Sequence, residues 1–350
     1  MTMVAAGPPA TRRGRGPTFH ALLVKAVIRE TPDAVSLVFD VPAQLKEAFS
    51  YQAGQFVTLR LVIDGAQHSR AYSMSSAPGV DADLQVTVKR VVDGLVSNWV
   101  VDNVHGGDRI DVSVPTGSFV LPEGESTTDV VAFAAGSGVT PILSVVKSVL
   151  HDTHGRVRMI YANRDRASVI FLECLHALQE QYPDRLQITY SFDDESGFVS
   201  PGQVADLLGT GLKSELFLCG PKGFMDMVTT TLVWCGVRSD QLHVELFSPD
   251  EDAGNAGAGS DAEVTVTLGG RTATIAHRAG WTLLHSARAA GLAAPSSCHL
   301  GQCATCVARV TEGQAEMANN QILTAEEVAE GWILTCQARP VTPRISVVYE

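Results

Sequence analysis

The sequence lacks three features that would place the protein in a membrane, outside the cell or on a nucleic acid. No apolar run approaches the roughly 18 residues that a membrane-spanning helix requires. Residues 1–16 contain arginines but no apolar segment, which argues against a secretory signal peptide. Basic clusters are also missing: 26 Lys and Arg against 38 Asp and Glu give a net charge of −12, unlike a nucleic-acid-binding protein. We therefore expect a cytoplasmic protein with no membrane span and no nucleic-acid partner.

The composition is that of a globular protein, with 45% hydrophobic and 18% charged residues. A chain of 350 residues has room for two or three domains, each with its own core. The patterns described below predict a multidomain α/β plus β fold, preceded by a disordered tail over residues 1–17. The acidic excess permits a partner with a positive docking face, although it also simply favours solubility.

Four of the seven cysteines form a motif near the end of the chain. Cys298, Cys303 and Cys306 have the spacing C-x4-C-x2-C, and Cys336 follows far downstream. This is the plant-type pattern for a [2Fe–2S] cluster, in which soft, anionic thiolates hold each iron. A structural zinc site stays open as an alternative, although only Cys303 and Cys306 make a CxxC pair. Disulfides are disfavoured because no secretory signal precedes the chain.

Residues 18–124 are predicted to form a small antiparallel β-barrel. Short alternating or apolar runs, separated by turn residues, occupy residues 34–41, 55–63, 84–91 and 109–114. Arg70 stands within this part, where a guanidinium on a strand can grip a pyrophosphate through bidentate hydrogen bonds. Ser97 is expected to be the N-cap of a short helix whose free amides favour an anion, or a capping serine and nothing more.

Residues 125–247 alternate between strand and helix, which predicts a parallel sheet with ligands at the carboxyl ends of its strands. We expect strands at residues 129–135, 156–162, 185–192, 215–219 and 242–247, and helices at residues 142–150, 169–181, 201–208 and 224–235. Glycine turns follow two of these strands, at residues 136–141 (GSGVTP) and 220–223 (GPKG). The first is not a GxGxxG fingerprint, but a strand, a glycine turn and a helix present a helix N-terminus to a phosphate.

The last part of the chain follows a predicted flexible linker at residues 248–262, which is acidic and rich in Gly and Ala. From residue 263 to residue 350 we expect a hairpin turned at Gly269 and Gly270, a helix ended by Gly291, the cysteine loop and two further strands. A helix and a few strands around one loop suit a β-grasp domain, although periodicity alone does not distinguish it from other small α+β folds.

Together the three parts resemble a flavoprotein of the ferredoxin–NADP reductase superfamily fused to a plant-type ferredoxin, from about Thr18 to the end. The strings that carry the resemblance are RAYS at 70–73, GSGVTP at 136–141, CGP at 219–221 and ELF at 245–247. The order of flavin, nicotinamide and ferredoxin domains is similar to reductase components of bacterial oxygenases. The string YANRDRASVIF at 161–171 especially resembles the reductases of 3-ketosteroid 9α-hydroxylase, with those of phenylacetyl-CoA epoxidase next.

The resemblance implies roles for flavin-binding residues. Arg70 would bind a flavin phosphate, Tyr72 the ribityl side, and Ser73 would lie near the reactive flavin nitrogen. Lys89 and Ser97 would also contact a cofactor. FAD is favoured over FMN, because the helix start near Ser97 offers a site for a second phosphate.

The resemblance also implies a nucleotide site and the groups next to the reacting rings. The dinucleotide would be held by Gly136, Gly138, Thr140, Pro141, Arg164, Cys219, Gly220 and Pro221. Ser73, Cys219, Glu245 and Phe247 would lie closest to the chemistry, with Phe247 over the isoalloxazine edge and a structural role as the alternative for Glu245. Arg164 and Arg166 could grip a 2′-phosphate, yet Asp165 lies between them, so we expect NADH, with NADPH as the alternative.

The implied activity is electron transfer from NADH through FAD and the [2Fe–2S] cluster to a terminal Rieske-type oxygenase, such as the 3-ketosteroid 9α-hydroxylase. Other monooxygenases, epoxidases, desaturases and hybrid-cluster proteins remain as acceptors, and a non-catalytic redox carrier or sensor is the alternative from another class. We expect a monomer. The cluster loop departs from the common pattern at His299 and Ala304, which leaves the hydrogen bonding of the cluster open.

Overall fold

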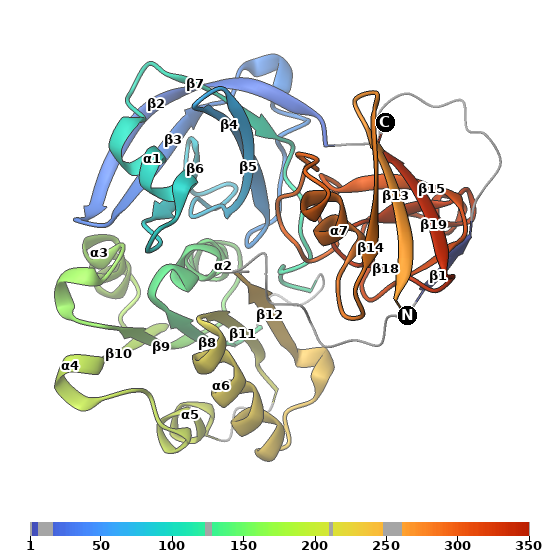
Figure 1. Ribbon diagram of the computed structural model, residues 1–350. Coiled ribbons are helices and arrows are strands. Elements are labelled where there is room, and N and C mark those ends of the chain that lie inside the picture. The colour runs from blue at the N-terminus through green and yellow to red at the C-terminus, as the bar shows by residue number, and fades with distance from the viewer. Residues whose placement is uncertain (1, 6–16, 123–127, 210–212, 248–260, 350) are drawn as a thin grey trace. The chain divides into compact units, whose positions relative to one another are not determined.

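A computed structural model describes residues 2–5, 17–122, 128–209, 213–247 and 261–349 (Figure 1). The chain divides into two compact units, one of which contains His20–Gln67 and Tyr72–Phe247. The other contains Met1–Phe19, His68–Ala71 and Ser248–Glu350. Most of the predicted linker, residues 248–260, lies outside the described residues. Within them, no helix is long and apolar enough to cross a membrane.

The first sheet is curled and antiparallel, with the strand order β5–β4–β7–β2–β3–β6, and belongs to the larger unit except for Phe19 of β2 and His68–Ala71 of β5. Its strands are β2 (Phe19–Thr31), β3 (Ala34–Asp40), β4 (Phe56–Ile63), β5 (Ala66–Ser73), β6 (Leu84–Lys89) and β7 (Arg109–Ser113). Alternate Val, Leu and Phe side chains of these strands form one core, on which helix α1 (Leu95–Asn103) also packs. The predicted antiparallel flavin-domain fold is confirmed.

The second part is a fully parallel sheet with the order β10–β9–β8–β11–β12. Its strands are β8 (Val130–Ala135), β9 (Val157–Asn163), β10 (Leu186–Phe192), β11 (Glu215–Gly220) and β12 (Leu242–Leu246). The helices are α2 (Val139–Asp152), α3 (Leu172–Gln181), α4 (Asp193–Ser196), α5 (Pro201–Leu208) and α6 (Lys222–Trp234). The predicted α/β architecture is confirmed.

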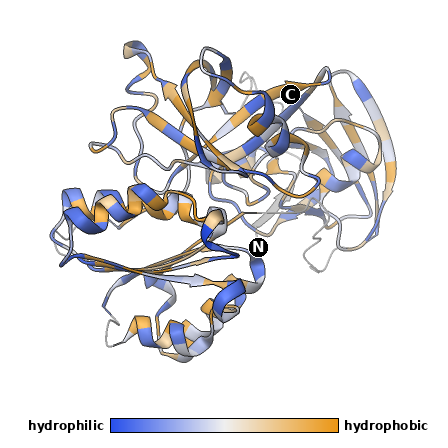
Figure 2. Cartoon of the chain, turned by 90° about the vertical axis from the view of Figure 1, so that its left-hand side faces the viewer, coloured by the Kyte–Doolittle hydropathy of each residue, from blue (hydrophilic) through white to orange (hydrophobic). Residues whose placement is uncertain are grey.

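The helices of this part cover both faces of the sheet, as Figure 2 shows. Apolar residues of α2 and α3 share a core with one face, and those of α5 and α6 share a core with the other. This is why β8, VVAFAA, is apolar throughout and buried at every position. The strand order reverses between β8 and β11, and such a reversal opens a crevice for ligands at the carboxyl ends of the strands.

The smaller unit contains a five-stranded sheet in the order β14–β13–β19–β15–β17 and a second sheet in the order β1–β16–β18. The elements of the first sheet are β13 (Ala262–Leu268), β14 (Arg271–His277), β15 (Val307–Glu312), β17 (Trp332–Leu334) and β19 (Arg344–Tyr349). The remaining elements are β1 (Thr2–Ala5), β16 (Gln314–Met317), β18 (Ala338–Pro340), α7 (Leu283–Ala289) and α8 (Ala325–Ala329). Helix α7 packs its apolar side on the mixed sheet, as expected of a β-grasp domain.

Thr2–Ala5 corrects the prediction of a disordered tail over residues 1–17. This segment forms β1 and pairs antiparallel with β16, from Thr2 opposite Met317 to Ala5 opposite Gln314. Residues 1 and 6–16 lie outside the described residues. Composition could not reveal this pairing, because main-chain hydrogen bonds to a strand some 300 positions away leave no local signal.

Candidate functional site

The first glycine turn follows the buried strand β8 and forms a short 3₁₀ turn, Gly136–Gly138, before α2. Gly136 has a φ of +52°, which favours glycine. Thr140 closes the turn, because its Oγ1 donates a hydrogen bond to Ser137 O at 3.0 Å. Pro141 is the third residue of α2, so the helix begins three residues before the predicted position. In the first turn, the missing N–H of proline costs no helical hydrogen bond.

The second turn follows β11 and lies directly against the first. A Cβ on Gly138 would come within 2.1 Å of Cys219 O, and one on Gly220 within 2.9 Å of Ala135 Cβ. Pro221 is the N-cap of α6. The structure thus brings together seven of the eight predicted nucleotide residues, all except Arg164, at the point where the strand order reverses. These two adjoining turns form what we call the nucleotide cradle. Their backbone amides can bind a dinucleotide diphosphate.

Cys219 and Glu245 are paired in the register of β11 and β12, and both are buried. Burial, with a smaller contribution from Glu245, raises the pKa of the Cys219 thiol well above its usual value. Burial raises the pKa of Glu245 to about 8. Around neutral pH the Cys219 thiol is therefore protonated, and the Glu245 carboxyl group is protonated in most molecules. Both side chains are then uncharged. Phe247, just beyond β12, packs against the core on the α2 side of the sheet.

The predicted flavin residues Arg70, Tyr72 and Ser73 occupy the last half of β5. Arg70 is half-buried and donates from Nη1 to the carbonyl of Ser69 at 2.9 Å. Tyr72 packs against the barrel core, and Ser73 is buried at the end of the strand. Because side chains alternate along a strand, Arg70 and Tyr72 share one face while Ser73 lies on the other.

The loop after β5 is joined to helix α2 by contacts that the sequence did not reveal. Ser144 Oγ donates to Ser76 O at 2.6 Å, with both residues buried. Lys147 Nζ lies 2.9 Å from an Asp81 carboxylate oxygen, with only 11% of the lysine side chain exposed. The flavin-side loop and the helix of the nucleotide turn are therefore tied together.

Lys89 ends β6 and lies near the first glycine turn. Its Nζ is 3.4 Å from the position that a Cβ on Gly136 would take. Burial, with a further contribution from the charge of Arg164, lowers the pKa of Lys89. A cation in this position fits a phosphate ligand, which would replace the solvation that burial removes.

The prediction that Ser97 is the N-cap of α1 is wrong. The N-cap is Gly94, and the helix begins at Leu95. Ser97 lies in the first turn, where its Oγ accepts a hydrogen bond from the backbone N–H of Val91 at 3.1 Å. Glycine takes the extended cap conformation readily, so the serine is free to fix the preceding turn.

Arg164 and Arg166 follow β9, and each is paired with a carboxylate. Arg164 is exposed and lies 2.8 Å from Asp165, which also accepts the backbone N–H of Ser168 at 2.8 Å. Arg166 lies 2.7 Å from Glu195 and stacks over the ring of Phe192 at 4.6 Å. The positive charge at this edge of the sheet is therefore largely neutralised.

Asn163 is a candidate ligand residue that the sequence analysis missed. It ends β9, is 4% exposed, and its amide makes no hydrogen bond of good geometry within the described part of the chain, although the Tyr161 hydroxyl lies near it. A buried amide without a partner is costly, and a bound ligand commonly supplies the missing hydrogen bonds. The only local signal was an asparagine at the end of an apolar strand.

The four predicted cluster cysteines are buried in the smaller unit, and all seven cysteines of the chain are free, which counts against disulfides. The four cluster cysteines lie in two neighbouring pairs: the backbone N–H of Cys298 donates to Cys303 Sγ at 3.5 Å, and the backbone N–H of Thr335, next to Cys336, donates to Cys306 O at 3.1 Å. The hydrogen bond from Cys298 lowers the pKa of Cys303 to about 6. Two pairs of buried sulfurs fit a cluster with two irons, each of which takes two thiolates.

The loop between the cysteines aims backbone amides at the sulfurs. The N–H groups of Leu300 and Gln302 both donate to Cys298 Sγ at 3.4 Å. His299, Gly301 and Ala304 have φ values of +55°, +77° and +56°, which fold the loop tightly enough for these bonds. Amide donors stabilise anionic thiolates, so the donor set fits a bound [2Fe–2S] cluster.

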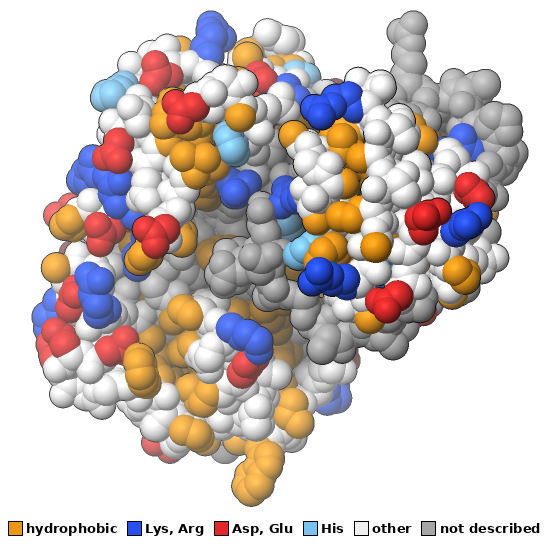
Figure 3. All heavy atoms as spheres, in the orientation of Figure 1, with side chains coloured by type: hydrophobic (Ala, Val, Ile, Leu, Met, Phe, Trp, Pro, Cys, Tyr) orange, Lys and Arg blue, Asp and Glu red, His pale blue; other side chains and the backbone are white. Residues whose placement is uncertain are grey.

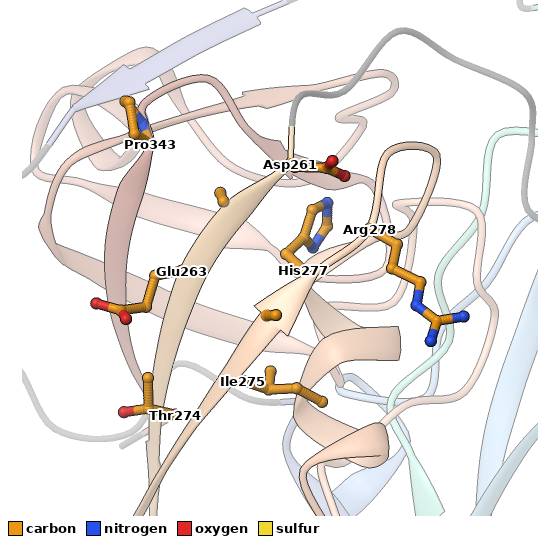
Figure 4. Close-up of a pocket in the computed structure, with 9 residues that line it drawn as sticks. Asp261, Glu263, Thr274, Ile275, His277, Arg278 and Pro343 are labelled. Carbon is orange, nitrogen blue, oxygen red and sulfur yellow. The ribbon is translucent and has the colours of Figure 1, made fainter.

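A pocket in the same unit is lined mainly by residues of the paired strands β13 and β14 and contains none of the predicted site residues (Figure 4). His277 lines it and is held by a 2.8 Å contact between its Nδ1 and Ser286 Oγ. The charged side chains that line it are those of Asp261, Glu263 and Arg278. On the face drawn in Figure 3, acidic and basic side chains are interspersed rather than grouped by sign.

Three family models match the chain in the predicted order. Residues 21–121 match an oxidoreductase FAD-binding domain, residues 133–230 an oxidoreductase NAD-binding domain, and residues 266–341 a 2Fe-2S iron-sulfur cluster binding domain. Each match lies inside one of the predicted domains, 18–124, 125–247 and 263–350. The last match favours the iron–sulfur interpretation of the cysteines over the zinc alternative.

Proteins with known roles resemble the chain over nearly its whole length. The ferredoxin reductase component of 3-ketosteroid-9-alpha-monooxygenase from Rhodococcus rhodochrous is 38% identical, covering 94% of this chain and 96% of that protein. One component of the 1,2-phenylacetyl-CoA epoxidase of Escherichia coli (strain K12) is 34% identical, covering 95% of this chain and 98% of that component. The crystal structure of phthalate dioxygenase reductase shares the fold, with a TM-score of 0.62 at 22% identity over 95% of this chain and 98% of that one.

Sequence, fold and site therefore agree on an oxidoreductase that uses FAD, a nicotinamide nucleotide and a 2Fe-2S centre. The glycine turns fit the nucleotide, β5 carries the flavin motif, and the cysteine loop fits the cluster. The chain belongs to the family of modular flavoprotein reductases with a C-terminal [2Fe–2S] domain that are the reductase components of oxygenases.

Proposed function

We propose that the protein is an NADH-dependent reductase that delivers single electrons to a separate Rieske-type oxygenase. The observation that carries the proposal is the presence of two cysteine pairs, lined by backbone amides, in a chain that also contains two closely packed glycine turns. These turns are the proposed binding site of the dinucleotide. When bound, FAD accepts a hydride from the nicotinamide and the [2Fe–2S] cluster carries the electrons onward one at a time. A reductase for an oxygenase needs this conversion from paired to single electrons.

In this proposal the two glycine turns bind and orient the nucleotide. Gly136 and Gly138 present backbone amides to its diphosphate, and Thr140 keeps the turn closed. Cys219 and Gly220 form the wall beside the nicotinamide, and the uncharged thiol of Cys219 places no negative charge there. The remaining contacts are assigned to Pro141, Pro221, Arg164 and the missed Asn163.

On the flavin side, Arg70 binds a phosphate and Tyr72 packs along the ribityl chain. Ser73, which is buried at the end of β5, is assigned to donate its hydroxyl hydrogen to the flavin ring. Lys89 contributes a cation between flavin and nucleotide, and Ser97 holds the turn before α1. Phe247 and Glu245 exclude water from the reacting rings.

Cys298, Cys303, Cys306 and Cys336 are assigned as the cluster ligands. We assign the acceptor to the Rieske class because the similar proteins include reductase components of oxygenases, such as that of the 3-ketosteroid enzyme. An epoxidase of the phenylacetyl-CoA type is the second candidate. We also propose that the protein is a monomer and is located in the cytoplasm.

The decisive experiment separates hydride transfer from onward electron transfer. Cys303→Ser in the full chain is expected to retain NADH-dependent reduction of ferricyanide, which flavin alone supports, and to lose reduction of the oxygenase. Cys235→Ser, beyond the end of α6, is the matched control and should retain both activities. Loss of both activities in folded, FAD-loaded Cys303→Ser would contradict the division of labour. Reconstitution with each candidate oxygenase then identifies the acceptor.

A further inference from the structure

A buried serine connects an arginine of α7 to the loop that carries three of the proposed cluster ligands. Ser296 is 4% exposed and lies two residues before Cys298. Arg288 Nη2 donates a hydrogen bond to Ser296 Oγ at 2.6 Å, and Ser296 Oγ lies 2.9 Å from His299 Nε2. The three side chains therefore form one continuous chain of hydrogen bonds from the helix to the cysteine loop.

The chemistry of the groups fixes the direction of the first bond in this chain. A guanidinium can only donate, so the oxygen of Ser296 accepts from Arg288. The serine hydroxyl still has one hydrogen and one lone pair for His299 Nε2, and the tautomer of the histidine decides which of the two atoms donates. Arg288 thereby orients the serine, and the serine orients the histidine ring.

His299 is also held at its backbone, in a conformation that histidine does not prefer. Its φ of +55° lies in the left-handed region. Gln337 Nε2, on the residue after Cys336, donates to His299 O at 2.7 Å. These bonds hold the peptide that follows His299, so the N–H of Leu300 stays directed at Cys298 Sγ at 3.4 Å.

Arg288 also lies in the last turn of α7, where any cation stabilises a helix C-terminus. That role does not account for its contacts. The 2.6 Å bond reaches Ser296, and a weaker one at 3.5 Å reaches the carbonyl of Ala294. Both partners lie beyond the helix, so the guanidinium is directed at the segment that enters the cysteine loop.

We propose that Arg288 is a positioning residue for the [2Fe–2S] cluster. Through Ser296 it fixes His299 and the loop, and its positive charge stabilises the electron that the cluster accepts. The proposal rests on the cysteine ligands assigned above. Because a cation near an electron acceptor favours the reduced form, removal of Arg288 makes the cluster harder to reduce.

Three variants of the full, cofactor-loaded chain separate the two parts of the proposal. Arg288→Met removes the charge and the hydrogen bond, Arg288→Lys keeps the charge without the planar fork, and Ser296→Ala breaks the chain while keeping the arginine. Arg344→Met is the control for loss of one charge, since Arg344 is exposed on β19 and pairs with Glu263 at 3.5 Å. Iron content, the reduced fraction at fixed solution potential and the electron paramagnetic resonance line shape are measured for each.

Arg288→Met is expected to lower the ratio of reduced to oxidised cluster by about three- to tenfold, where tenfold corresponds to about 59 mV for one electron. Arg288→Lys should restore most of this ratio but not the line shape. Ser296→Ala should change the line shape with a smaller change in ratio, and Arg344→Met should match the unaltered chain.

A wild-type ratio and line shape in Arg288→Met would overturn the proposal, as would an equal shift in Arg344→Met. If Arg288→Met binds no iron, Arg288→Lys and Ser296→Ala decide the outcome. The proposal is overturned if both of these variants match the unaltered chain, and it is supported if Ser296→Ala alters the line shape. A wrong assignment of the cluster ligands can be told apart from a wrong role for Arg288. It would appear as full iron content and an unchanged spectrum in Cys303→Ser.

Discussion

Gly138 of the first glycine turn lies directly against the carbonyl group of Cys219 at the end of β11. A Cβ on Gly138 would come within 2.1 Å of Cys219 O and 2.8 Å of Gly220 N. Those neighbours are backbone atoms of a buried strand end, so they cannot move aside as a flexible side chain would. The two halves of the proposed nucleotide cradle are therefore as close as backbone atoms allow.

Gly138→Ala should separate the two turns and misplace the nicotinamide. We expect at least a tenfold loss of kcat/KM for NADH, because a displacement of about 1 Å at a reacting centre can cost on the order of a hundredfold. FAD and iron content should stay unchanged. Stopped-flow reduction of the flavin by NADH measures the effect.

The control for this substitution is Gly202→Ala in α5. A Cβ there would meet only Ser200 Oγ at 3.8 Å, so the helix should tolerate it and gain slightly in stability. Equal flavin reduction rates in Gly138→Ala and the unaltered chain would show that the contact does not position the nucleotide.

Glu245 should make the stability of the nucleotide domain depend on pH. Its pKa is about 8 in the folded chain against 4.5 for an unperturbed glutamate. The folded state therefore holds the proton more tightly, and its stabilising contribution is fully present below about pH 4.5 and is lost as the pH rises through about 8. Within this window the free energy of unfolding falls by up to about 1.4 kcal/mol for each pH unit. Thermal unfolding between pH 5 and 8 measures it.

Glu245→Gln should flatten this pH dependence and raise the unfolding temperature at pH 8, because no charge then needs to be buried. Glu47→Gln, which alters an exposed carboxylate near the barrel, is the control and should keep the slope of the unaltered chain. An unchanged slope in Glu245→Gln would refute the assignment of the effect to Glu245.

Lys147→Met should loosen the link between the flavin-side loop and α2. The lysine lies 2.9 Å from Asp81 with 11% of its side chain exposed, so we expect a loss of about 1–2 kcal/mol and slower flavin reduction. Lys25→Met breaks the matched but more exposed pair with Asp83, which does not reach α2, and should cost less. Denaturant unfolding followed by flavin fluorescence compares the two variants, and equal losses would contradict the proposed role.

Features with a local cause could be predicted from the sequence. The apolar strand β8 followed by glycines, and the cysteine spacing, depend on residues that are neighbours in the chain. The cap of α1 could not be settled, because the choice between Gly94 and Ser97 depends on the serine reaching back to Val91. The contact of Lys147 with Asp81 joins residues 66 positions apart, and a pairing set by tertiary packing leaves no periodic signal.

Glu195→Gln should widen nucleotide use. In the unaltered chain the guanidinium of Arg166 is occupied by Glu195 at 2.7 Å and 3.2 Å, and the carboxylate would repel a 2′-phosphate. NADH should therefore be preferred. Removal of the negative charge should raise kcat/KM for NADPH relative to NADH several-fold, about what one partly solvated charge contributes.

Asp240→Asn is the matched control for that substitution. It breaks the exposed Arg238–Asp240 pair, which lies just before β12 at the opposite edge of the sheet from Glu195. Because a 2′-phosphate is expected after β9, this change should leave the nucleotide preference as it is. Steady-state ferricyanide reduction with each nucleotide gives the ratio directly. A ratio that shifts equally in both variants would assign the preference to net charge, whereas a shift in Glu195→Gln alone assigns it to the carboxylate that occupies Arg166.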